Sequence, residues 1–143
     1  MQFLTAQMAE FPYSSVDKNV IAIRDCGGKE RPDVVWDLPD RIVILEIDED
    51  QHDGRQCVCE QARMINISQA FGCERTIWIR FNPDAFKSNA SRKWSSANKR
   101  HLFLKQWLQW SFSVDLTSLS TISVIYLFFD DFSESDVKVE KLL

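Results

Sequence analysis

The stretch RPDVVWDLPDRIVILEIDEDQH, residues 31–52, carries the pattern that decides the fold. Two runs rich in β-branched and other apolar residues, 33–37 and 42–48, flank the short segment LPDR, whose Pro-Asp pair is typical of a turn. This pattern predicts an antiparallel hairpin. Whether the loop contains four residues or two, the same register follows, and it places Asp33 opposite Glu46.

Carboxylates converge at one end of this hairpin. Side chains alternate along a strand, so Glu46 and Asp48 share a face, and in the predicted register Asp33 lies about 5 Å from Glu46. Like charges destabilise each other unless protons or a cation compensate, and Mg²⁺ or Mn²⁺ prefers oxygen ligands. Solvated acids at strand ends are the alternative, but Glu46 follows four apolar residues on a buried strand. If the strand continues, His52 shares the face and can transfer a proton.

Three motifs of this region resemble the PD-(D/E)XK nuclease superfamily: Arg31-Pro32-Asp33, Glu46-Ile47-Asp48 and Gln51-His52. The pattern is most similar to the branch of very-short-patch-repair endonucleases, whose second motif reads E-x-D followed by a histidine. The resemblance covers about residues 26–84. It implies an α/β fold with a restriction-endonuclease-like mixed sheet flanked by helices, and Mg²⁺-dependent hydrolysis of DNA phosphodiester bonds.

The resemblance also implies roles for individual residues. Asp33 and Glu46 match the metal-binding acids, and the carbonyl of Ile47 matches a backbone ligand. Asp48 would support the metal or the attacking water, and His52 would assist proton transfer. A metal of this kind lowers the pKa of its bound water and stabilises charge on the phosphodiester.

The superfamily's lysine is absent, because Asp48 occupies its position and no lysine occurs between residues 29 and 87. His52 or Arg63 would substitute for it. Arg63 lies with Asn66 on the polar side of a predicted helix, from which it can reach a scissile phosphate if that helix covers the sheet near the acids. An ion pair between Arg63 and Glu60 is the alternative.

The remaining sequence predicts a single domain, residues 1–143, with its core at about 17–129 and an acidic C-terminal tail at 130–143. Besides the hairpin, the predicted strands are 17–23, 76–81 and 122–129, and the predicted helices are 59–71 and 95–110. Gly72 stands where a helix-ending glycine belongs. The order strand, hairpin, helix, strand, helix, strand is typical of an α/β sandwich around a mixed sheet.

Composition excludes several other classes of protein. Of the 143 residues, 45% are hydrophobic and 27% charged, and the net charge is −4, so the chain is no general polycation. Its longest apolar run, 124–129, is too short for a membrane span, and the N-terminus lacks the features of a signal peptide. We therefore expect an intracellular protein, in cytoplasm or nucleus, with reduced thiols and no membrane partner.

Two further patterns suggest ligands. Cys26, Cys57, Cys59 and Cys73 could form a structural Zn²⁺ site, with His52 as a substitute ligand, as in the very-short-patch-repair enzymes, although small buried cysteines are the alternative. The segment 87–105 contains six bases and no acid, so it resembles a surface that follows a phosphate backbone. Its candidate DNA-binding residues are Lys93, Lys99, Arg100 and Trp94, the last by stacking on a base. A solvated basic helix start is the alternative there, and the helically spaced Phe103, Trp107 and Trp110 are assigned to the core.

These observations favour a Mg²⁺-dependent endonuclease acting on DNA. An enzyme that cuts both strands often acts as two copies, so a homodimer is the candidate assembly. A nuclease-like module that binds nucleic acid or protein without cutting is the second hypothesis, and a zinc-stabilised interaction domain is the third.

Overall fold

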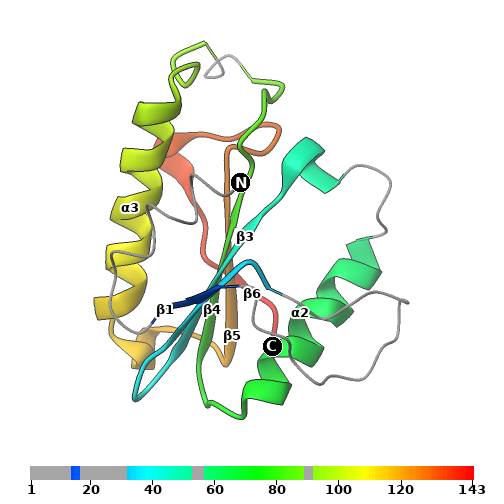
Figure 1. Ribbon diagram of the computed structural model, residues 1–143, viewed down its shortest axis with the longest axis vertical. Coiled ribbons are helices and arrows are strands. Elements are labelled where there is room, and N and C mark those ends of the chain that lie inside the picture. Colours follow the sequence, from blue (N-terminus) through cyan, green and yellow to red (C-terminus); the bar gives the residue numbers. More distant parts are fainter. Residues whose placement is uncertain (1–13, 17–31, 53–56, 89–91) are drawn as a thin grey trace.

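The protein is built on one open mixed sheet (Figure 1). The structure, a computed structural model, describes residues 14–16, 32–52, 57–88 and 92–143. The strands are β1 (Ser14–Val16), β2 (Val34–Asp37), β3 (Ile42–Ile47), β4 (Thr76–Phe81), β5 (Ile122–Leu127) and β6 (Glu140–Lys141). The helices are α2 (Cys57–Phe71) and α3 (Ala97–Ser113), with short 3₁₀ turns η1 (Glu49–His52), η2 (Leu116–Ser118) and η3 (Glu134–Asp136). The strands lie side by side in chain order.

The predicted hairpin is confirmed, with its register. Strands β2 and β3 are antiparallel, and Asp37 pairs with Ile42 and Val35 with Ile44. The turn is closed by a hydrogen bond of 3.0 Å from the N–H of Leu38 to the carbonyl of Arg41. Beyond the hairpin, β3, β4 and β5 run parallel, while β1 and β6 are antiparallel edge strands. The mixed α/β architecture therefore agrees with the sequence pattern.

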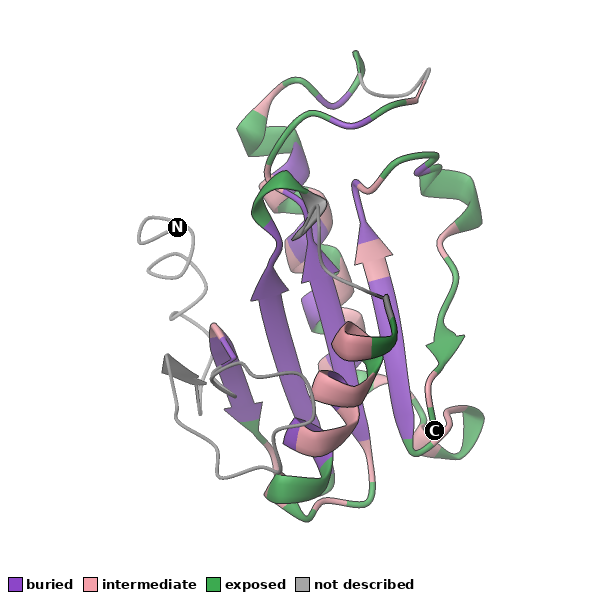
Figure 2. Cartoon of the chain, turned by 90° about the vertical axis from the view of Figure 1, so that its right-hand side faces the viewer, coloured by how far each residue is buried: buried purple, intermediate pink, exposed green. Residues whose placement is uncertain are grey.

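One helix packs on each face of the sheet. This arrangement follows because the side chains of the central strands are largely apolar on both faces and need to be covered on both. Helix α2 covers one face through Met64 and Ile67, and α3 covers the other through Leu104 and Leu108. Figure 2 looks onto the α2 side, where the central strands are buried behind that helix. Gly72 ends α2 at φ +69°, the left-handed conformation that glycine adopts without steric cost.

Several boundaries differ from the predicted ones. The predicted strand 17–23 lies outside the described residues. Helix α3 ends at Ser113, three residues beyond the predicted end, and β5 ends at Leu127. The acidic tail is not an appendage, because its β6 segment pairs with β5 through Ser123–Lys141 and Val124–Glu140. Edge pairing uses backbone groups, so the charged sequence of β6 gave no signal for it.

The assignment of the α3 aromatic residues to the core is confirmed, although they are not its most buried members. Phe103, Trp107 and Trp110 are only partly buried at the margin of the α3 core. Leu104 and Leu108, one position along from the first two, are fully buried. Helical spacing defines a face, but only the packing decides which of two adjacent faces meets the sheet.

Among the described residues, no helix combines the length and the apolar character needed to cross a membrane.

Candidate active site

The candidate site lies on the α2 face, at the carboxyl ends of β3 and β4. Glu46 is the fifth residue of β3, and its partner across the parallel ladder is Arg80 of β4. Asp33 directly precedes β2, next to the Val34–Leu45 pair. Because β3 is a central strand, Glu46 is only 4% exposed. Charged side chains are therefore buried between the sheet and α2.

Asp33 and Glu46 are held together by reciprocal hydrogen bonds. The backbone N–H of Asp33 donates to Oε2 of Glu46 at 3.2 Å, and the N–H of Ile47 donates to Oδ2 of Asp33 at 2.8 Å. The predicted juxtaposition of these two acids is therefore confirmed. The carboxylate of Glu46 holds the backbone of Asp33, and that of Asp33 holds the backbone one residue beyond Glu46, so the pair is placed with little freedom.

The carbonyl of Ile47 faces the same side as Asp33. In a strand, the N–H and the C=O of one residue point toward the same neighbour. The N–H of Ile47 reaches Asp33, whereas the next N–H, that of Asp48, donates to the carbonyl of Phe81 on β4 at 2.8 Å. Strand geometry therefore directs the backbone oxygen of Ile47 toward the β2 side of β3, where Asp33 lies.

Arg63 of α2 reaches this pair directly. Its Nη2 lies 2.7 Å from Oε1 of Glu46, and the two side chains are 12% and 6% exposed. The helix does cover the sheet near Glu46, which was the condition for a role of Arg63. The alternative was an ion pair between Arg63 and Glu60. Glu60 instead pairs with Arg80, and its Oε2 lies 2.8 Å from Nη1 of that arginine.

Asp48 is committed to Arg80, which corrects its predicted role beside the metal. Nε and Nη2 of Arg80 donate to the two oxygens of Asp48, both at 2.6 Å, and the Asp48 side chain is fully buried. This bidentate pair takes both carboxylate oxygens of Asp48. Sequence reasoning missed Arg80, although an arginine inside the apolar strand TIWIRF indicates that a buried acid must lie nearby.

The positive charge missing from the lysine position is thus supplied from two other elements. Six charged side chains form what we call the carboxylate–arginine cluster. Its members are Asp33, Glu46, Asp48, Glu60, Arg63 and Arg80. With every carboxyl ionised, these described residues bring four negative charges against two positive charges.

Burial dominates the titration of Glu46. Desolvation, the largest cause, raises its pKa; the positive charges of Arg63 and Arg80 lower it, and the charges of Asp33 and Asp48 raise it, so that the net pKa is raised from 4.5 to about 7. For Arg80, burial alone would lower the pKa, but the hydrogen bonds and charge of Asp48 and Glu60 raise it above the ordinary value. The two arginines therefore compensate the buried charge of Glu46 only in part.

The oxygen donors suit a hard divalent cation in kind. Within the described residues, however, no three His, Cys, Asp or Glu side chains are grouped so as to hold a metal ion. A site at this position would use two carboxylates, those of Asp33 and Glu46, with the carbonyl of Ile47. Divalent Mg²⁺ keeps several waters and needs only one or two carboxylates, so this donor set fits it.

The proposed place of His52 rested on a continued strand, and that premise is wrong. Strand β3 ends at Ile47, and the chain turns into η1 at Glu49, so the alternation of faces stops before His52. Asp50 takes φ +54° in this turn, and its N–H donates to Oδ2 of Asp84 at 2.6 Å. The side chain of His52 is not among the described ones.

Cys59 and Cys73 are too far apart to share one metal ion, so a site formed by all four cysteines is not present. Cys59 lies in the first turn of α2 and Cys73 lies two residues beyond its end, and the helical residues between them span about 18 Å. Cys59 is in a disulfide bond, which also differs from the expected reduced thiols, while Cys73 is free and half-buried. Cys26 and the side chain of Cys57 lie outside the described part. Closeness of thiols in space is not readable from their spacing in sequence.

Two predicted DNA contacts are instead structural. Trp94 is 6% exposed and packs edge-on against Phe128 at 5.1 Å between ring centroids, so it is not presented for stacking on a base. Arg100, also 6% exposed, donates to the carbonyls of Trp94 at 2.6 Å and Asp84 at 2.7 Å. Its burial lowers its pKa from the ordinary value. Arg100 thus holds the β4–α3 connection together.

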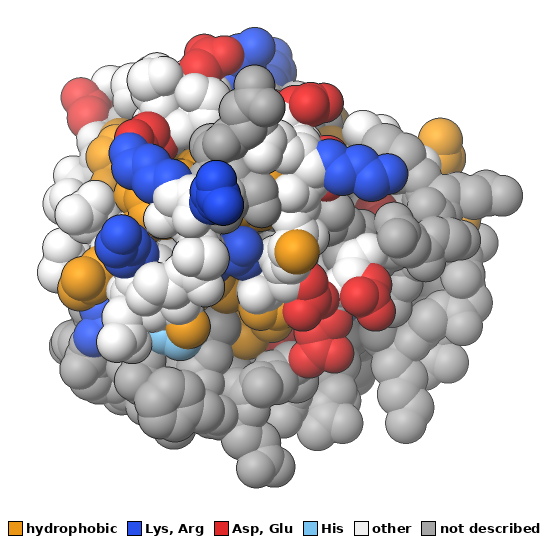
Figure 3. All heavy atoms as spheres, turned by 90° about the horizontal axis from the view of Figure 1, so that it is seen from above, with side chains coloured by type: hydrophobic (Ala, Val, Ile, Leu, Met, Phe, Trp, Pro, Cys, Tyr) orange, Lys and Arg blue, Asp and Glu red, His pale blue; other side chains and the backbone are white. Residues whose placement is uncertain are grey.

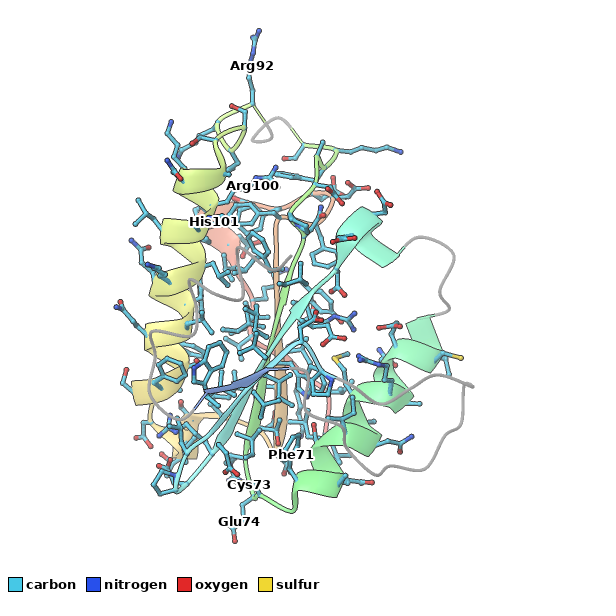
Figure 4. All side chains as sticks on the ribbon, viewed as in Figure 1. Phe71, Cys73, Glu74, Arg92, Arg100 and His101 are labelled. Carbon is cyan, nitrogen blue, oxygen red and sulfur yellow. The ribbon has the colours of Figure 1, made fainter. Side chains whose placement is uncertain are left out.

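Of the other bases of this segment, Lys105 is half-buried and the remaining four are exposed. Figure 3 looks onto the end of the molecule at which the parallel strands finish, and Lys and Arg side chains are spread over it beside a group of acids. We call the exposed bases there the basic end: Lys87, Arg92, Lys93 and Lys99. Lys93 is ion-paired with Glu134. Figure 4 shows Arg92 and Arg100 at this end and Cys73 and Glu74 at the opposite one.

Comparison of the chain with protein-family models, with curated proteins and with solved structures finds no match.

Proposed function

We propose that the protein is a Mg²⁺-dependent endonuclease that hydrolyses DNA phosphodiester bonds. The observation that carries the proposal is the coupling of Asp33 and Glu46 at the end of the β2–β3 hairpin, inside a cluster that has more carboxylates than guanidinium groups. Buried charge without full compensation is costly, and functional sites are where proteins retain it.

The roles follow from the contacts. Asp33, Glu46 and the carbonyl of Ile47 would hold the cation, which when bound supplies a water of lowered pKa and positive charge for the phosphodiester. Arg63 lies beside them and can donate two parallel hydrogen bonds to a phosphate. Asp48 and Glu60 position Arg80, whose charge helps to keep Glu46 ionised.

The basic end supports DNA as the substrate. Its exposed bases lie at the same end of the parallel strands as the carboxylates, so a phosphate backbone that contacts them passes over the carboxyl ends of β3 to β5. The net charge of the protein is −4, so this local concentration of bases, and not the overall charge, would attract the polyanion.

The test is a cleavage panel of plain, mismatched and branched DNA, and of RNA, with Mg²⁺ and Mn²⁺. Asp33→Asn and Glu46→Gln preserve side-chain volume. Each should lower the rate of metal-dependent cleavage by on the order of 100-fold or more. Glu49→Gln, a change of an exposed acid just beyond β3, is the matched control and should cleave normally. Cleavage at wild-type rates by both site variants would reject the proposal.

A second function, a nuclease-like module that binds without cutting, is favoured by one observation. Asp48 is locked to Arg80 and Glu46 is paired with Arg63, so both acids of the E-x-D motif already have cationic partners. Calorimetry with Mn²⁺ separates the two: the endonuclease requires metal binding that Glu46→Gln removes, whereas the binding module requires none.

A further inference from the structure

We propose that Arg63 is an exchangeable counter-ion: it neutralises Glu46 when no metal is bound, and it leaves Glu46 for a phosphate of the nucleic acid when the cation binds. This inference rests on the proposed function and adds to it a coupling between metal and DNA binding. It is carried by the 2.7 Å contact between Nη2 of Arg63 and Oε1 of Glu46.

The two arginines of the carboxylate–arginine cluster are held very differently. Arg80 projects from the central strand β4, is 4% exposed, and is fixed by a bidentate pair with Asp48 and a contact with Glu60. Arg63 projects from α2, is 12% exposed, and meets Glu46 near the carboxyl end of β3. Moving Arg80 would remove the bidentate partner of the fully buried Asp48, whereas the contact between Arg63 and Glu46 joins one nitrogen to one oxygen on a more exposed side chain. Of the two arginines, we therefore assign the exchange of partners to Arg63.

Arg63 and a divalent cation compete for the same group. Oε2 of Glu46 already accepts the N–H of Asp33, and Oε1 faces Arg63. A guanidinium and a divalent cation on one carboxylate would lie a few ångströms apart in a poorly solvated place, where like charges repel strongly. Binding of one therefore disfavours the other, and the coupling is reciprocal.

The displaced guanidinium has a suitable destination. A phosphate of the nucleic acid at this site would lie close to the metal. It offers two oxygens that the planar guanidinium of arginine can bind together, which the single ammonium of lysine does not match. Metal binding would then create a DNA contact that the metal-free protein lacks. Arg63 would act as a positioning residue for the phosphate and as the substitute for the absent motif lysine.

The experiment measures Mn²⁺ binding to the full chain by calorimetry at about pH 8, without nucleic acid. Removal of the competing charge in Arg63→Ala and Arg63→Gln should tighten Mn²⁺ binding about tenfold. Arg63→Lys keeps the charge and should stay near the wild type. Arg75→Ala, which removes an equal charge at the opposite end of β4, is the control and should bind as the wild type does. Thermal unfolding checks that each variant is folded.

A second measurement reads the phosphate contact. Wild-type affinity for a DNA duplex should rise about tenfold when Ca²⁺, another oxygen-binding divalent ion, replaces EDTA, and Arg63→Gln should lose most of this gain. Folded Arg63→Ala and Arg63→Gln proteins with unchanged or weaker Mn²⁺ affinity would overturn the exchange. If the exchange is overturned in this way but the wild type binds Mn²⁺ and Glu46→Gln does not, the proposed endonuclease function still stands. Absence of Mn²⁺ binding in the wild type and in every variant would reject both the exchange and the endonuclease function.

Discussion

Arg80 and Asp48 form a two-pronged ion pair inside the sheet, with both nitrogen–oxygen distances at 2.6 Å and with side chains 4% and 0% exposed. Arg80 belongs to β4 and Asp48 follows β3, so the pair joins the two neighbouring parallel strands at the end of their ladder. Its consequence is structural, because it holds together the carboxyl ends of β3 and β4, next to which Glu46 and Arg63 meet.

Removal of one partner of this pair should be strongly destabilising. Arg80→Met leaves Asp48 as an uncompensated buried charge, and we expect a loss of about 3–5 kcal/mol in the free energy of unfolding. The double variant Asp48→Leu with Arg80→Met replaces the pair by apolar groups and should recover most of that loss. Urea denaturation of the three proteins measures it. A cost below about 1 kcal/mol for Arg80→Met would show that the pair contributes little.

The titration of Glu46 predicts a pH dependence of stability in metal-free buffer. Its pKa is raised from 4.5 to about 7 in the folded protein, so the folded protein holds this proton where the unfolded chain releases it. The stability contribution is fully present below the unfolded pKa and is lost as the pH rises through about 7. The loss is on the order of 3 kcal/mol.

Glu46→Gln cannot titrate and should therefore gain stability relative to the wild type between about pH 5 and pH 8. Chemical denaturation at several pH values measures the difference. The control is Glu49→Gln, because Glu49 is exposed and its variant should follow the wild type throughout. Parallel curves for Glu46→Gln and the wild type would contradict the raised pKa.

The basic end predicts a specific change in the salt dependence of DNA binding. Lys99 is exposed in the first turn of α3, and Lys99→Ala should weaken binding and reduce the slope of log K against log salt concentration by about 1. Lys141 of β6 is equally exposed, and Lys141→Ala should leave the slope unchanged. Fluorescence anisotropy over a salt series distinguishes them, and equal slopes for all three proteins would exclude a contact by Lys99.

Local sequence was sufficient for the hairpin and for the pairing of its two acids. Alternation and turn chemistry act over a few residues, so the register that joins Asp33 to Glu46 is encoded within residues 31–52. The helix end at Gly72 is encoded in the same local way, by a residue that tolerates positive φ. The strand β6 lacked such a signal, because an edge strand is defined by the backbone of its neighbour.

The partners of the buried charges could not be predicted in this way. Arg63 and Glu60 were close in sequence, yet they pair with Glu46 and Arg80, which come from different strands. Trp94 and Arg100 looked like a surface for DNA, but packing against the end of β5 and the β4–α3 connection buried both. Ion pairs and burial depend on which elements meet, and a residue's own neighbours in the chain do not contain that information.

The amino-acid sequence by itself therefore determined the α/β class, the β2–β3 register and the meeting of two carboxylates at its end, since each follows from short-range periodicity. Only the tertiary structure decided that Asp48 faces Arg80 and that Arg63 faces Glu46. The physical reason is that a buried charge takes whichever opposite charge the packing of helix on sheet brings within about 3 Å, wherever that partner lies in the chain.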